Sequence, residues 1–239
     1  MSFRFQNNGD RLELIGPSAF LNGLSEITVI SFIRADPSMI GTDRGWLTSI
    51  DPDGTDNCIT QRFDNAGFLG GADDCIKLGV STDTGESNLE TLDNTQVTGF
   101  FSVAHRWQSG QVVEPYVNGE LAGVTADSGI VGNLTANSTT FELGRAGKDT
   151  SASLSWSGDV FYARVYDRYL SPEEISTIYY CGGSDGIFDG LILYWQAFGP
   201  VGATIPNVQV IKDLTKTKAD GQPVNNPTWG ATPVKRRRQ

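Results

Sequence analysis

Apolar and polar residues alternate with a period of two along most of this chain, and this pattern limits its fold more than any other feature. The clearest runs are residues 28–34, 99–107, 112–117 and 160–166. Such alternation is typical of strands with one buried and one exposed face. Turn sequences such as Asn118-Gly119 separate the runs, so the pattern predicts an all-β fold, a multi-strand antiparallel sandwich.

One short helix is predicted over residues 171–179. Ser171 is suited to cap the helix, Pro172 fits its first position, and Glu174 follows the cap by three residues, as in a capping box. The apolar residues of this segment recur at helical spacing, so we expect the helix to dock on the sandwich.

The net charge of -10 conceals an asymmetry between the body of the chain and its last residues. Four of the 18 basic residues are Lys235, Arg236, Arg237 and Arg238, so the other 235 residues carry 14 minus 28, or -14. Such a body repels phosphate backbones, and nucleic acid is expected only at this basic arm, if anywhere. The arm has two other interpretations: a solubilising tail, or a partner-binding segment that docks on an acidic neighbouring subunit.

Neither export nor membrane insertion is predicted. Met1 leads directly into the first expected strand without a signal peptide, and no apolar run is long enough to span a bilayer. Cys58, Cys75 and Cys181 are an odd number of cysteines, and we expect all three to be reduced.

Three segments carry a family resemblance: RFQNNGDRLEL (residues 4–14), SVAHRWQSGQVVEPYVNGELAGV (102–124) and ELGRAGKDTSASLSWSGDVFYARVYDRYLSPEEISTIY (142–179). Together they resemble laminin-G-like domains of the concanavalin A-like lectin-glucanase superfamily. The resemblance implies a jelly-roll β-sandwich over residues 1–182, and a rim site for calcium and sugars that is common in the family.

Residues 183–232 resemble the piece that commonly precedes the opening strand in this family. We expect this segment to complete the sandwich in cis, with docking on a neighbouring subunit as the alternative. Residues 233–239 form the basic flexible tail.

Catalytic chemistry is not predicted. A glycosidase of this fold needs paired carboxylates alternating on one strand, and no such run is present. His105 is the only histidine, and a structural or an exposed position in its strand is favoured over catalysis. The cysteines lack the spacing of a zinc site, so we expect no enzyme activity and no required cofactor.

Two binding sites are candidates. Asp51, Asp53 and Asp56 place oxygen donors on one tight loop and are candidate calcium ligands; an acidic hairpin turn is the simpler interpretation. Trp46 and Trp107 lie near predicted loops and are candidates for stacking on sugar rings, with packing in the core as the alternative.

The function expected first is that of a non-catalytic bacteriophage structural protein, such as a capsid decoration, head fibre or tail-associated module. It would be assembled in the host cytoplasm into the virion, bind other virion proteins and form a homo-oligomer. The alternative is a carbohydrate-binding lectin or adhesin, with or without calcium, that recognises host surface glycans.

Overall fold

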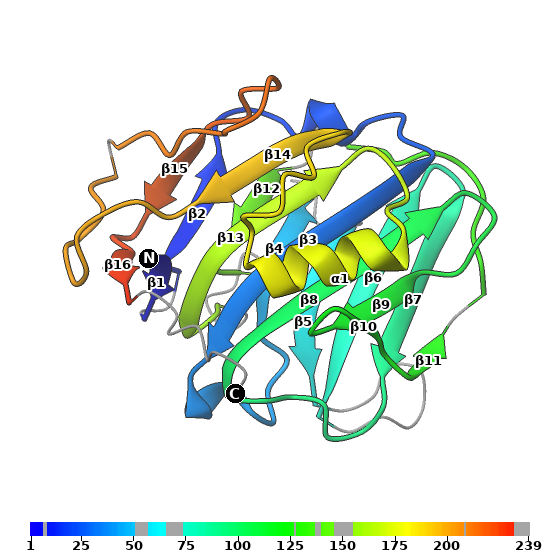
Figure 1. Cartoon of the computed structure of the whole chain (residues 1–239), viewed down its shortest axis with the longest axis horizontal. Coiled ribbons are helices and arrows are strands. Elements are labelled where there is room, and N and C mark those ends of the chain that lie inside the picture. Colours follow the sequence, from blue (N-terminus) through cyan, green and yellow to red (C-terminus); the bar gives the residue numbers. More distant parts are fainter. Residues whose placement is uncertain are drawn as a thin grey trace.

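The computed structural model describes residues 1–6, 9–50, 57–65, 74–126, 128–136, 140–145, 155–207 and 209–231. Two antiparallel sheets stack on each other, and one helix lies across the front of the first sheet (Figure 1). This arrangement confirms the predicted all-β jelly-roll sandwich with one short helix.

The first sheet, sheet A, has the strand order β10-β9-β8-β3-β13-β1-β16, with β14 also paired to β13. Its strands are β1 (Ser2–Phe5), β3 (Glu26–Ala35), β8 (Gly99–Gln108), β9 (Glu114–Val117), β10 (Glu120–Leu121), β13 (Gly158–Tyr166), β14 (Leu191–Gln196) and β16 (Thr228–Gly230).

The second sheet, sheet B, has the order β11-β7-β6-β5-β4-β12-β2-β15. Its strands are β2 (Arg11–Leu14), β4 (Gly45–Ile50), β5 (Asn57–Asp64), β6 (Cys75–Thr82), β7 (Gly85–Thr91), β11 (Val124–Ala126), β12 (Thr140–Leu143) and β15 (Gly221–Val224). Two 3-10 turns, η1 (Ala19–Leu21) and η2 (Pro37–Met39), flank β3.

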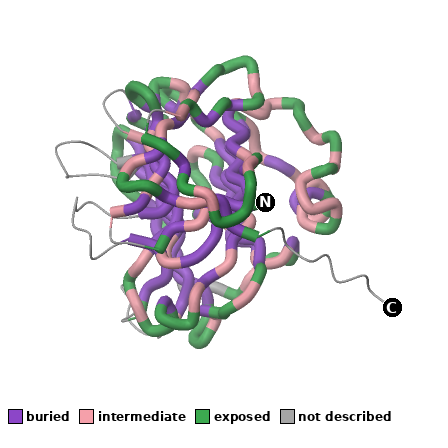
Figure 2. Tube along the Cα trace, turned by 90° about the vertical axis from the view of Figure 1, so that its left-hand side faces the viewer, coloured by how far each residue is buried: buried purple, intermediate pink, exposed green. Residues whose placement is uncertain are grey.

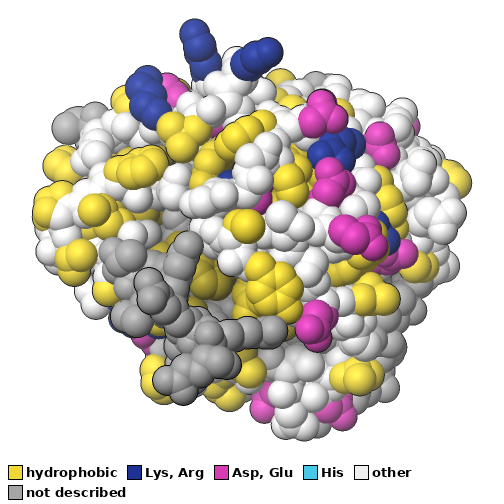
Figure 3. Space-filling view, viewed as in Figure 1, with side chains coloured by type: hydrophobic (Ala, Val, Ile, Leu, Met, Phe, Trp, Pro, Cys, Tyr) yellow, Lys and Arg dark blue, Asp and Glu magenta, His cyan; other side chains and the backbone are white. Residues whose placement is uncertain are grey.

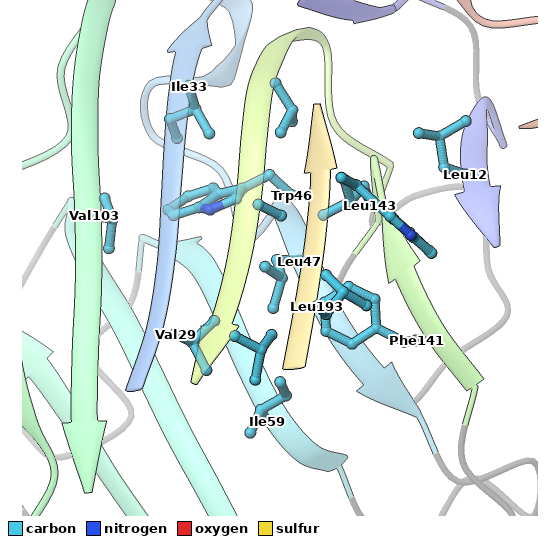
Figure 4. Packing of buried hydrophobic residues seen from close by; sticks show 14 of the residues in the cluster. Leu12, Val29, Ile33, Trp46, Leu47, Ile59, Val103, Phe141, Leu143 and Leu193 are labelled. Carbon is cyan, nitrogen blue, oxygen red and sulfur yellow. The ribbon is translucent and has the colours of Figure 1, made fainter. Parts of the chain in front are cut away.

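The core lies between the sheets and follows from the predicted alternation. Val29, Ile33 and Val103 point inward from sheet A and meet Leu47 and Ile59 from sheet B (Figure 4). Buried residues run through the middle of the molecule, and exposed ones gather in the turns around it (Figure 2).

The helix, α1 (Pro172–Cys181), forms as predicted. The Ser171 hydroxyl accepts a hydrogen bond from the Glu174 amide, and the Glu174 carboxylate accepts one from the Ser171 amide. Gly182 ends the helix in the left-handed conformation, with φ of 57°. Ile175 and Ile178 pack on the outer face of sheet A, in a second apolar cluster.

The C-terminal segment adds strands to both sheets of its own chain. β14 pairs with β13, β15 pairs with β2, and β16 pairs with β1. The indole of Trp195 is fully buried and donates a hydrogen bond to the Ala219 carbonyl at 2.7 Å. Exchange of this segment with a second subunit remains a prediction.

The three cysteines are free, with Cys58 and Cys75 buried. Within the described ranges, no helix is long and apolar enough to cross a membrane.

Candidate functional site

The outward face of sheet B is polar, whereas its inward face is apolar. On β2, Leu12 and Leu14 enter the core, so Arg11 and Glu13 point away from it. On β12, Phe141 and Leu143 likewise place Glu142 on the outer side. We call the outward positions of the sheet B strands, together with Arg145 just beyond β12, the polar face.

Register aligns these polar side chains into a row that crosses seven strands. Residues directly opposite one another form the sequence Asn88, Gly79, Thr60, Thr48, Glu142, Glu13 and Gln222. Opposite residues on antiparallel strands lie about 5 Å apart, so the row is a nearly continuous line of hydroxyl, amide and carboxylate groups.

Four charged residues at the β2 and β12 end of the row form what we call the charged ladder: Arg11, Glu13, Glu142 and Arg145. Arg145 donates two hydrogen bonds of 2.7 Å, one to each carboxylate oxygen of Glu142. Arg11 donates to Glu13 at 2.9 and 3.1 Å and lies 3.4 Å from Glu142. The ladder therefore joins two strands through alternating charges.

Exposure differs along the polar face. The Arg11 and Glu13 side chains keep 20% and 26% of their surface, and Gln222 is half-buried beside them. Thr48 on β4 and Glu90 on β7 are fully buried, and Glu142 and Arg145 are nearly so. The accessible part of the row is therefore its charged-ladder end.

A second charged group lies across β5, β6 and β7. Arg62 binds Asp64 at 2.6 Å, and Lys77 stands directly between Arg62 and Glu90 in the register. Burial lowers the pKa of Lys77, and the neighbouring Arg62 lowers it further, while nearby carboxylates oppose the shift. Each of these cations has a carboxylate beside it.

The accessible end offers hydrogen bonding but no aromatic ring for stacking among the described strand residues. Carboxylates accept, guanidinium groups donate and the Gln222 amide does both, which suits a ligand rich in hydroxyl groups. No aromatic residue occupies an outward position in the described strands of sheet B. Both oxygens of Glu142 are occupied by Arg145 donors, so this carboxylate is not arranged to act as a general acid.

Trp46 and Trp107 are not on the surface, which corrects their assignment as glycan-stacking residues. Both are fully buried, as the core-packing alternative required. The strands reach further than the sequence indicated, and a register shift between Gly45 and Leu47 lets Trp46 turn inward. Its indole nitrogen donates to Ser31 at 2.8 Å and to Gln61 at 2.9 Å.

His105 belongs to the same buried polar cluster, in agreement with a structural role. Its Nδ1 lies 3.1 Å from the Gln61 amide nitrogen. Since the Gln61 oxygen already accepts from Trp46 and Ser31, the amide nitrogen donates to Nδ1, and the proton of the neutral imidazole is on Nε2. Complete burial lowers the pKa of His105 to about 3.

The remaining predicted site residues lie outside the described ranges: Asp51, Asp53 and Asp56 of the candidate calcium loop, and Lys235, Arg236, Arg237 and Arg238 of the basic arm. Within those ranges, no group of three or more potential ligands gathers to hold a metal ion.

The charged ladder escaped the sequence interpretation although a signal was present. In β2 (RLEL), charged residues occupy every second position, and in β12 (TFEL) one charged residue lies between two core residues. Both patterns indicate the outward face of a strand. The pairing of β2 with β12 joins segments about 130 residues apart, and the alternation does not encode which strands become neighbours.

The opposite side of the molecule has a different character. On the face that carries α1, hydrophobic side chains lie scattered among polar and acidic ones (Figure 3). Phe100, 40% exposed, is among the exposed large hydrophobic residues on the outer side of sheet A.

Solved structures share this fold at low sequence identity. A Bacteroides ovatus protein described as a "putative carbohydrate binding protein" matches with a TM-score of 0.70 and 17% identity, over 98% of this chain and 60% of its own. A heptameric SAP-like pentraxin from Limulus polyphemus matches at 0.55 and 18%, over 76% and 82%. The CBM40 of a Ruminococcus gnavus IT-sialidase matches at 0.53 and 14%, over 74% and 95%.

This chain thus spans 60% of the length of the Bacteroides protein. No match was found among curated proteins. None of the three structures is a virion protein, and the virion role remains a prediction.

A family profile described as the concanavalin A-like lectin/glucanases superfamily matches residues 13–176, which is more than half of the sequence. The chain therefore belongs to the concanavalin A-like lectin/glucanases superfamily.

Proposed function

We propose that this chain is a non-catalytic glycan-binding domain and that it binds sugar hydroxyl groups on the polar face of sheet B. The observation that carries the proposal is the seven-strand polar row, whose accessible end is formed by Arg11, Glu13 and Gln222. Family membership and the structural likeness to carbohydrate-binding proteins support it.

The chemistry of the ladder suits this role. Charged donors and acceptors form stronger hydrogen bonds with hydroxyl groups than neutral ones do. Arg11 and Glu13 are held by each other, so little side-chain entropy is lost when a ligand binds. A glycan lying along the row would meet several such groups in succession, and their individually modest contributions would add.

The carboxylates support binding over catalysis. A glycosidase acid must carry a proton, whereas Glu142 is held by two hydrogen bonds from one guanidinium group and Glu13 by two from another. We therefore infer that the ladder binds sugars without cleaving them.

The test is binding of the purified chain to an array of glycans, followed by titration calorimetry on those that bind. We expect Glu13→Ala and Gln222→Ala each to weaken binding by about tenfold, as the loss of a charge-assisted or direct hydrogen bond predicts. Glu114→Ala is the matched control, since Glu114 is a carboxylate paired with an arginine on sheet A.

Three results would oppose the proposal. Binding to no glycan on the array would exclude the function. Unchanged binding in both ladder-end variants would place the site elsewhere on the molecule. An equal loss in Glu114→Ala would show that the loss does not come from the polar face.

A further inference from the structure

We propose that the polar face selects neutral glycans and rejects anionic ones such as sialylated or sulfated sugars. This inference rests on the proposed function and adds the ligand class. Its basis is that every cation on the described polar face is already next to a carboxylate of the same face.

The pairing is direct at the accessible end. Arg11 uses Nε and Nη2 on Glu13 and Nη1 on the Gly9 carbonyl, while Arg145 is held to both oxygens of Glu142. An incoming sugar carboxylate or sulfate would have to replace one of these bonds and would then lie beside the displaced carboxylate. Like charges brought together at a binding surface weaken binding.

The middle of the sheet follows the same rule. Arg62 is paired with Asp64, and Lys77 faces Glu90 in the register. The polar face as a whole carries four cationic groups, and five carboxylates lie at its outward positions.

The cationic groups are Arg11, Arg62, Lys77 and Arg145, and the carboxylates are Glu13, Asp64, Glu86, Glu90 and Glu142. Four minus five leaves a face with a net charge of -1. The remainder of the molecule adds to this effect, because the whole chain carries -10, and -10 minus -1 leaves -9 outside the polar face. The long-range field thus repels anions before contact.

A change at Glu13 tests the pairing directly. Glu13→Gln removes the carboxylate that holds Arg11 and keeps the size and shape of the side chain. Two guanidinium groups would then share Glu142, and the ladder would carry a net charge of +1. We expect this variant to bind anionic sugars at least about tenfold more tightly than the wild type does. A tenfold gain is what one new charge-assisted hydrogen bond contributes.

The matched control is Glu114→Gln. It also removes one negative charge and leaves an arginine without its carboxylate, since Glu114 binds Arg106 at 2.6 Å on sheet A. Both variants change the net charge from -10 to -9, so a general electrostatic effect would be equal in the two. A thermal unfolding curve on each confirms that the variants are folded.

The experiment uses sugars in matched pairs at about 150 mM salt, where long-range attraction between exposed charges is largely screened. Lactose is compared with α2,3-sialyllactose, and a neutral galactan with a sulfated one. For the wild-type chain we expect binding to neutral members and at least about tenfold weaker binding to their anionic counterparts.

The outcomes separate the two proposals. Anionic members bound as well as neutral ones, or better, would overturn the selectivity and leave the glycan-binding function standing. Binding to neither member of any pair would overturn both. If Glu13→Gln does not bind anionic sugars more tightly than the wild type, the charged ladder does not set the selectivity. The same conclusion follows if Glu114→Gln gains affinity for anionic sugars to an equal extent.

Discussion

The buried histidine predicts a specific dependence of stability on pH. His105 is fully buried, its Nε2 has no hydrogen-bond partner among the described residues, and its pKa is lowered from 6.5 to about 3 by removal from water. An imidazolium ion at this position would be unsolvated and uncompensated in the core.

The direction of the pH dependence follows from comparing proton binding in the folded and unfolded states. The unfolded chain binds a proton on this histidine below pH 6.5, and the folded chain does so only near pH 3. Stability from this group is therefore complete above pH 6.5 and falls as the pH is lowered toward 3. A full pH unit is worth about 1.36 kcal/mol, and the unfolded histidine is already half protonated at pH 6.5, so moving from pH 6.5 to 4.5 removes about 2 kcal/mol. A typical domain has only about 5–15 kcal/mol in total.

The assay is urea unfolding followed by tryptophan fluorescence between pH 4.5 and 7.5. The variant His105→Gln keeps an acceptor for the Gln61 amide and does not titrate. We expect the wild type to lose about 2 kcal/mol more than the variant does between pH 6.5 and 4.5, because all other titrating groups are common to both.

One measurement of the native state can refute this reasoning independently. The chain contains one histidine, so its Hε1 proton resonance needs no assignment. A native resonance that titrates near pH 6.5, or unfolding free energies that fall in parallel for the two chains, would show that burial does not hold this group neutral.

Three further predictions concern packing and reactivity. Trp195→Ala removes a fully buried indole and its hydrogen bond, and should lower the unfolding free energy by about 3–5 kcal/mol in urea titrations; a loss below about 1 kcal/mol would mean that the C-terminal segment does not pack in cis. Asp185→Ala leaves the buried Arg164 without its carboxylate, 3.0 Å away, and should cost a similar 3–5 kcal/mol or so by calorimetry, whereas a neutral result would exclude a fully desolvated pair. In native protein at pH 8, Cys181 should react with a thiol reagent well before the other two cysteines, since burial raises their pKa to about 12; three equal rates would contradict this.

The sequence predicted those features of the fold that depend on neighbouring residues. Alternation located β3 and β13, and the capping box located α1, because both signals act within a few residues. The place of Trp46 could not be predicted in this way, since it depends on a register shift against β5. The ladder depends on β2 meeting β12, so its charges were visible in the sequence while their juxtaposition was not.

The family resemblance predicted the fold correctly, and the glycan binding that it implies is the function proposed above. It directed attention to rim loops and tryptophans, whereas the candidate site described above lies on a sheet face and Trp46 and Trp107 are buried. Strand polarity indicates the polar face, because a charged residue between two core residues points outward.

The pairing of the first strands with the last has a consequence for how this chain reaches its native state. β1 lies between β13 and β16, and β2 lies between β12 and β15, so each early strand has at least one neighbour from beyond residue 220. Contacts of such large sequence separation form slowly, because a long loop must close before they are made. During synthesis, the first two strands would leave the ribosome long before these partners exist. We therefore expect both sheets to be completed late and cooperatively. Until β15 and β16 pair with them, β2 and β1 would each have one exposed edge.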